Sequence, residues 1–257
     1  MQPEDPATIP VPKRWWLLPL LLLAADLVLM GIHFAGHYVP ALRHPRLMVS
    51  TDWSYGEMLQ YVKELAIAAA FVVLYARRHA GILLVWAALF VFLLADDALS
   101  LHENAGAMIR RGLDLPSMFG LRGQDFGELA AVAPIGLLFA GLLFVTFRRS
   151  DTLARSLSLA TLILTGVLAG FGIVGDMLHS AIQVHRWFFA LLEDGGEMLA
   201  MTAIATLVYA ELRRVPWRRW LATSPLAAKA PPPLRRLIAA LSGGGTEGSP
   251  LTSAGKP

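Results

Sequence analysis

The sequence predicts an all-α integral membrane protein, a bundle of six transmembrane helices. Three observations carry this prediction: the composition, the length of the apolar segments, and the placement of basic residues between them. The chain has 257 residues, of which 56% are hydrophobic and only 16% are charged, and its mean hydropathy is +0.55. Because a soluble domain carries about 25% charged residues, the composition excludes an ordinary soluble enzyme.

Six apolar segments are the candidate helices. A helix needs about 20 apolar residues to cross the hydrocarbon core of a bilayer, and four of the segments approach that length. The segments that begin at residues 80 and 198 reach it only if their polar ends are included. The first segment is longer than the hydrophobic core of a secretory signal peptide, about 7–15 residues, so we expect it to remain as an anchor. The segments are 15–34, 58–76, 80–95, 126–147, 157–174 and 198–210.

Basic residues flank alternate ends of these segments, which is typical of cytoplasmic loops. They include Lys13-Arg14, Arg77-Arg78, Arg148-Arg149 and Arg213-Arg214. We therefore expect both termini to lie in the cytoplasm and the protein to be a multi-pass component of a bacterial inner membrane. Topology explains these basic residues, so we expect no nucleic-acid partner, and the lipid bilayer is the expected partner.

The predicted organisation has three parts. Residues 1–12 form a cytoplasmic N-terminal segment and residues 13–220 form the transmembrane domain. Residues 221–257 are rich in Ala, Pro, Gly, Ser and Thr, a composition that does not bury enough apolar surface to fold, so we expect a disordered cytoplasmic tail. The chain has no cysteine, which excludes disulfides and thiolate metal sites.

Acidic residues and histidines gather at the ends of the segments opposite the basic pairs. Ionisable groups in transmembrane helices are expensive to bury and by default mark a functional site. We therefore expect a functional pocket at the outer, periplasmic end of the bundle. This end holds 14 of the 19 acidic residues and six of the seven histidines: Asp26, Asp52, Glu57, Glu64, Asp96, Asp97, Glu103, Asp114, Asp125, Glu128, Asp176, Glu193, Asp194, Glu197, His33, His37, His44, His102, His179 and His185.

Helical spacing places several of these residues on shared faces, since residues three, four or seven apart lie on one side of a helix. In the first segment, His33 and His37 are four apart. In the second, Glu57 and Glu64 are seven apart, and Glu64 lies about 10 Å deeper at 1.5 Å per residue. The first two helices are thus expected to carry polar groups into the membrane.

The third segment ends in the most informative run. If its helix continues through residue 103, Asp96, Ser100 and Glu103 share a face, and His102 lies about 120° around from it. In the fifth segment, Asp176 and His179 have the acid-x-x-His spacing of helix-bundle metal sites, with Asp in place of Glu. In the sixth, Glu197 lies one turn after Glu193.

These patterns favour a metal-dependent membrane enzyme. Histidine and carboxylate ligands without cysteine favour a divalent metal, Zn or Fe/Mn, and a metal-bound water is a nucleophile for hydrolysis of a lipid or another membrane-accessible substrate. The expected metal ligands are His33, His37, His102, Glu103, Asp176, His179 and Glu197. The expected catalytic residues are Asp96, Glu64 and Ser100.

Two other functions are open from the sequence. A carboxylate-lined funnel is also typical of a cation or proton transporter or channel, although the inner halves of the six segments are largely apolar. A metal-binding sensor or assembly factor without catalysis is the other. Individual residues also have structural interpretations: Asp125 and Glu128, like Glu193 and Asp194, can complement a helix N-terminus.

Overall fold

The structure is a computed structural model that describes residues 14–118, 120–181, 186–214 and 231–232, without the side chains of residues 179–181, 186 and 214. The predicted segment 1–12 lies outside the described residues, as does the predicted tail 221–257 apart from Pro231 and Pro232. The chain divides into two compact units, Pro12–Leu212 and Met1–Val11 with Arg213–Pro257. The helical bundle and the site belong to Pro12–Leu212.

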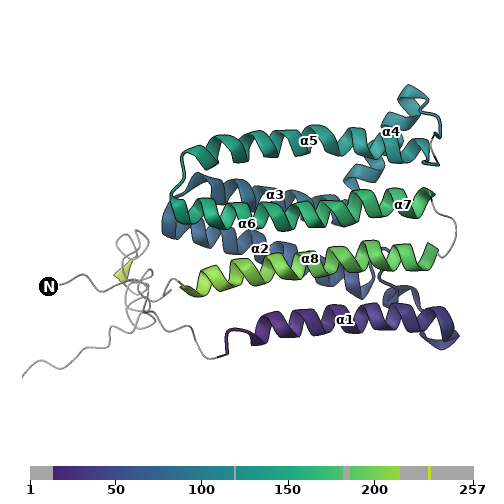
Figure 1. Ribbon diagram of the computed structural model, residues 1–257, viewed down its shortest axis with the longest axis horizontal. Helices are drawn as coiled ribbons and strands as arrows, with labels where there is room; N and C mark the ends of the chain where they lie inside the picture. The colour runs from purple at the N-terminus through teal and green to yellow at the C-terminus, as the bar shows by residue number, and fades with distance from the viewer. Residues whose placement is uncertain (1–13, 119, 182–185, 215–230, 233–257) are drawn as a thin grey trace, which may run out of the picture. The chain divides into compact units, whose positions relative to one another are not determined.

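The described residues are helical and contain no strand, which confirms the all-α prediction. Figure 1 shows the long helices running along one common direction. A π-helical segment, Gly170–Val174, joins α6 to α7, and short 3-10 turns at Pro40–Leu42 and Pro45–Leu47 follow α1. The α-helices are α1 (Leu17–Tyr38), α2 (Tyr55–Arg78), α3 (Gly81–Leu99), α4 (Leu101–Leu113), α5 (Gly123–Arg148), α6 (Thr152–Ala169), α7 (Gly175–Ala181) and α8 (Arg186–Arg214).

Among the described residues, five helices are long and apolar enough to cross a membrane: α1, α2, α3, α5 and the continuous run Thr152–Leu178. The sixth predicted span falls in α8, whose apolar stretch 198–210 is bounded by Glu197 and Glu211. Thirteen residues rise only about 20 Å at 1.5 Å per residue, less than the ~30 Å hydrocarbon core. The six-span count therefore stays a prediction.

A buried apolar core holds α2 and α3 together and extends to α6 and α8. Phe71, Trp86 and Phe90 stack at its centre, with ring centroids 6.0–6.4 Å apart. The indole Nε1 of Trp86 donates to Ser158 Oγ at 2.8 Å, which satisfies its polar atom.

Large apolar side chains also cover the outside of the bundle. Leu21, Leu137 and Phe144 are 66%, 74% and 64% exposed. Soluble monomers rarely expose large contiguous apolar patches, so these helices are compatible with direct contact with lipid.

The basic ends of α2 and α8 are fastened to each other. Arg78 forms an ion pair with Glu211 at 2.5 Å, and Arg77 donates to the carbonyl oxygen of Leu212 at 3.0 Å. The predicted sorting of basic residues to one end holds for these two helices. The orientation of that end toward the cytoplasm stays a prediction.

Candidate metal centre

A cavity of about 850 Å³ opens among the helices α2 to α8. Its described lining contains twelve carboxylates but only two basic side chains, His102 and Arg122. So many like charges repel one another unless protons or cations neutralise them. The twelve are Asp52, Glu57, Glu64, Asp96, Asp97, Glu103, Asp125, Glu128, Asp176, Glu193, Asp194 and Glu197.

The cavity brings together most of the residues that the sequence singles out. Those that line it are Glu64, Asp96, Ser100, His102, Glu103, Asp176 and Glu197. His33 and His37 do not line it, and the side chain of His179 lies outside the described residues. Of the four histidines expected as metal ligands, His102 is therefore the one that the described part of the chain places in the cavity.

The two histidines of α1 have other neighbours. The Nδ1 atom of His33 accepts from the backbone N–H of Val49 at 3.2 Å, and the ring also bonds the backbone of Trp187. The ring of His37 stacks on the Trp187 indole with centroids 4.4 Å apart. Both histidines thus connect α1 to neighbouring segments, and their role as metal ligands stays a prediction.

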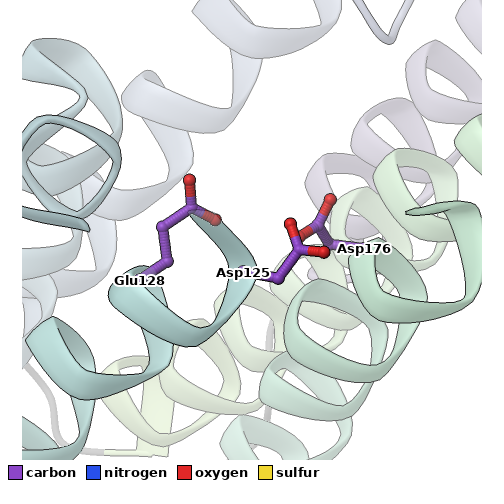
Figure 2. Close-up of side chains that lie close together, drawn as sticks. All are labelled: Asp125, Glu128 and Asp176. Carbon is purple, nitrogen blue, oxygen red and sulfur yellow. The ribbon is translucent and has the colours of Figure 1, made fainter. Parts of the chain in front are cut away.

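The tightest convergence of carboxylates joins α5 to α7. One carboxylate oxygen from each of Asp125, Glu128 and Asp176 lies within 4.8 Å of the other two, and Figure 2 shows Asp125 next to Asp176, with Glu128 to one side on α5. We call these three residues the acidic triad. Asp125 and Glu128 are one turn apart on α5, so a single helix presents both to Asp176. An acidic cluster of this size is able to hold a metal ion.

Two glycines position Glu128 by letting α4 and α5 meet backbone to backbone. A Cβ atom on Gly106 of α4 would lie 2.7 Å from the backbone nitrogen of Glu128, and one on Gly127 would lie 2.3 Å from the carbonyl oxygen of Gly106. Real Cβ atoms are essentially never this close to another heavy atom, so only glycine fits at either position. The close approach of the helices sets where the triad lies along α5.

Arg122 is the positive counter-charge of the triad. Its guanidinium lies 2.6 Å from Asp125 Oδ1 and 3.6 Å from Asp176 Oδ1. The Asp125 carboxylate also accepts from the backbone N–H of Arg122 at 2.8 Å, which forms the start of α5. The hydrogen bond to Asp125 raises the pKa of Arg122. The cap interpretation of Asp125 is thus confirmed, and the same residue belongs to the triad.

A break in the chain creates a second polar pair. The prediction that one helix continues through residue 103 is wrong. The helix α3 ends at Leu99 and α4 starts at Leu101, because Ser100 between them adopts a left-handed conformation with φ of 46°. The turn brings His102 back onto Asp96, whose carboxylate accepts from the His102 backbone N–H and bonds the ring Nδ1, both at 2.9 Å. Left-handed non-glycine residues often mark functional sites.

The Asp96 contact determines how His102 titrates. The hydrogen bond to Asp96 outweighs burial and raises the pKa of His102 from 6.5 to about 9. Because the folded-state pKa is raised, the pair stabilises the fold fully below pH 6.5, and this stabilisation is lost as the pH rises through about 9. We expect the difference in unfolding free energy between wild type and His102→Gln to be constant below pH 6.5 and to shrink toward pH 9.

Denaturant titrations of both proteins in detergent across this pH range measure that difference. A difference that grows with pH would contradict the assignment of the Asp96–His102 pair.

A third polar group lies where α2 meets α3. The carboxyl groups of Glu64 and Asp97 interact with each other there. Glu64 is only 1% exposed, and its second oxygen Oε2 has no hydrogen-bond partner among the described residues. The amide oxygen of Gln60, one turn earlier and 7% exposed, is also unpaired. Unsatisfied buried oxygens are rare in native proteins and indicate a missing partner.

The π-helical segment positions Glu197. A Cβ atom on Gly172 would lie 2.3 Å from Glu197 Oε1, so the absence of a side chain there gives the carboxylate its place. The π-helix also changes the phase of the chain between α6 and Asp176, and such segments are frequent at functional sites. Neither feature is visible in the apolar pattern of residues 157–174.

Asp26, the deepest acidic residue of α1, is not part of the cavity. Its carboxylate pairs with Lys63 of α2 at 3.0 Å, and Thr202 of α8 donates to its other oxygen at 2.6 Å. Lys63 also donates to the carbonyl oxygen of Met198 at 3.0 Å. With Asp26 and Lys63 0% and 1% exposed, this buried network fastens three helices together.

Comparison with known proteins gives a family but no activity. No curated protein and no solved structure matches the chain. The family model described as a domain of unknown function (DUF8692) matches residues 14–210, which include every residue named above in the cavity lining. Since this match covers more than half of the chain, the protein belongs to the DUF8692 family.

Proposed function

We propose that the protein is a membrane enzyme that holds a divalent cation at the acidic triad and uses it to hydrolyse a substrate bound in the cavity. The observation that carries this proposal is the convergence of Asp125, Glu128 and Asp176 within 4.8 Å. Three carboxylates against the single guanidinium of Arg122 give a formal charge of −3 + 1 = −2 when all are ionised. A divalent cation neutralises this charge.

The chemistry of the lining favours a hard cation. The triad offers only carboxylate oxygens, and His102 is the one imidazole among the described cavity residues. Carboxylate oxygens suit Mn²⁺ and related ions, whereas structural and catalytic zinc sites rely mostly on His and Cys. We therefore favour Mn²⁺ or Fe²⁺ over Zn²⁺ within the set that the sequence predicts.

The Asp96–His102 pair supports a hydrolytic role. A buried carboxylate holds Nδ1 of the imidazole, while Nε2 has no hydrogen-bond partner among the described residues and the ring lines the cavity. This is how general acids and bases are oriented in enzymes. If bound, a divalent cation would supply an activated water. His102, which its raised pKa of about 9 keeps protonated at neutral pH, would donate a proton to the leaving group.

The distribution of polar groups supports an enzyme over a transport pathway. On α5, the lining residues after Glu128 are Leu129, Val132, Gly136, Phe139, Ala140 and Leu143, all apolar. A conduction path needs polar groups or broken helices across the membrane midplane. The apolar half of the cavity supplies none on this wall.

Cation binding by detergent-purified protein tests the proposal. We expect wild type to bind Mn²⁺ stoichiometrically in calorimetric titration. Asp176→Asn and Glu128→Gln should each weaken binding at least about tenfold, since even changes beyond the direct ligands weaken metal affinity by about 10–100-fold. Asp114→Asn is the matched control, because Asp114 lies outside the cavity and its φ of 48° suits asparagine.

A further variant separates a cation site from an Arg-paired cluster. Arg122→Gln removes the competing positive charge beside Asp125 and Asp176, so Mn²⁺ should bind more tightly than to wild type. Equal binding by wild type and both triad variants, or no binding by any of them, would overturn the proposal.

A further inference from the structure

The deep half of the cavity is a chamber with apolar walls on three helices. On α5 the wall runs from Leu129 to Leu143, which lie fourteen positions or about 21 Å apart at 1.5 Å per residue. The facing walls come from α3, with Trp86, Leu89 and Leu93, and from α6, with Leu162, Thr165, Leu168 and Ala169. Thr165 has the one hydroxyl among these residues. We call this space the apolar chamber.

Side chains of the described residues leave the chamber unfilled. Gly136 lines it, and a Cβ atom placed there would meet no heavy atom within 4 Å. Native interiors are close-packed, with few voids larger than a water molecule, whereas cavities of about 300–1,000 Å³ are characteristic of ligand sites. A continuous cavity of about 850 Å³ therefore indicates an occupant.

The helix α5 is packed at its two ends and loose between them. Its buried residues are Gly123, Asp125 and Gly127 at the start and Leu143 near the end. None of the residues in between is buried, and Leu129 of α5 and Leu162 of α6 line the chamber while 41% and 51% exposed. The side of the bundle between α5 and α6 is thus the route by which a chain from the bilayer reaches the chamber.

We infer that the apolar chamber binds a hydrocarbon chain of a membrane lipid, with the lipid head group at the acidic end of the cavity. One leaflet of the ~30 Å hydrocarbon core is about 15 Å thick, so an extended chain fits within the ~21 Å wall. The inference rests on the proposed function only for the head group, which would contact the bound cation through its oxygens. Burial of the chain between α3, α5 and α6 requires no cation.

Quenching of Trp86 by lipids with brominated chains tests the inference. Trp86 lines the chamber and is 0% exposed, so bromine comes close to its ring when a chain enters the chamber. The protein is placed in phosphatidylcholine bilayers with chain-brominated or ordinary lipid, and the Trp86 signal is the fluorescence of wild type minus that of Trp86→Phe. We expect this signal to be quenched by the brominated lipid.

Two glycine variants of α5 supply the comparison. Gly136→Leu places a side chain in the chamber from a Cβ position that meets no heavy atom within 4 Å, and it should abolish Trp86 quenching. Gly141→Leu adds the same side chain on the same helix. Gly141 lies outside the cavity lining, and a Cβ atom there also meets no heavy atom within 4 Å. This variant should leave Trp86 quenching intact. Absence of quenching in wild type, or equal quenching in both variants, would overturn the inference.

Mn²⁺ titration of the same samples keeps the two proposals apart. Quenching without Mn²⁺ binding would support the lipid site and contradict the proposed cation-dependent enzyme. Mn²⁺ binding without quenching of Trp86 would support the cation site and contradict the binding of a lipid chain in the apolar chamber.

Discussion

Replacing Lys63 with methionine is expected to lower the free energy of unfolding by about 3–5 kcal/mol, because it leaves the Asp26 carboxylate buried without its counter-charge. Asp26 is 0% exposed, and after the substitution only the Thr202 hydroxyl remains as its hydrogen-bond donor. The Lys63 Nζ contacts to Met198 and Thr202 are lost as well. Denaturant or thermal unfolding in detergent measures the change.

The double variant Lys63→Met with Asp26→Leu is the control. Replacing both members of a buried ion pair with apolar residues of similar size is often neutral, and the Thr202 hydroxyl can then bond the carbonyl oxygen of Met198 one turn earlier. We expect the double variant to recover most of the lost stability. A double variant less stable than Lys63→Met alone would show that the pair is not the source of the effect.

Gly127→Ala is expected to destabilise the protein by about 1–3 kcal/mol, the range for overpacking a tight contact. Its Cβ atom would lie 2.3 Å from the carbonyl oxygen of Gly106, and a backbone atom cannot move aside without shifting α4 against α5. Because Glu128 and Asp125 flank Gly127, the shift should also weaken Mn²⁺ binding. Unfolding and calorimetry on the same preparation measure both effects.

Gly141→Ala provides the matched comparison on the same helix. A Cβ atom there meets no heavy atom within 4 Å, so the change only removes the conformational freedom of glycine and should stabilise α5 by about 0.5–1 kcal/mol. Mn²⁺ binding should be unchanged. If Gly127→Ala behaves like Gly141→Ala, the backbone contact between α4 and α5 is not what positions the triad.

The sequence predicts the helical bundle because apolar runs of membrane length have no other folded state in a bilayer. It is less informative for α8, where acids at residues 197 and 211 interrupt the apolar run near both ends. It also predicts that polar groups cluster at one end, and the structure places Asp96, His102, Asp176 and Glu197 in the lining of one cavity. Amphipathic spacing along single helices carries that information.

What sequence spacing missed depends on where helices break and touch. The left-handed Ser100 turns His102 onto Asp96, which a regular helix would have placed about 120° from it. Asp125 and Glu128 fit a helix cap, and their convergence with Asp176 depends on how α5 lies beside α7, which spacing within one helix does not contain. The spacing of Asp125 and Glu128 beside Arg122 is the one local signal that could have indicated the triad.

The most direct test of the central claim is an experimental structure of the protein crystallised with Mn²⁺ and measured at a wavelength where manganese scatters anomalously. We expect an anomalous peak within bonding distance of Asp125, Glu128 and Asp176, and none in the Asp176→Asn variant. An Mn²⁺-saturated structure with an intact triad and no peak in the cavity would contradict the account.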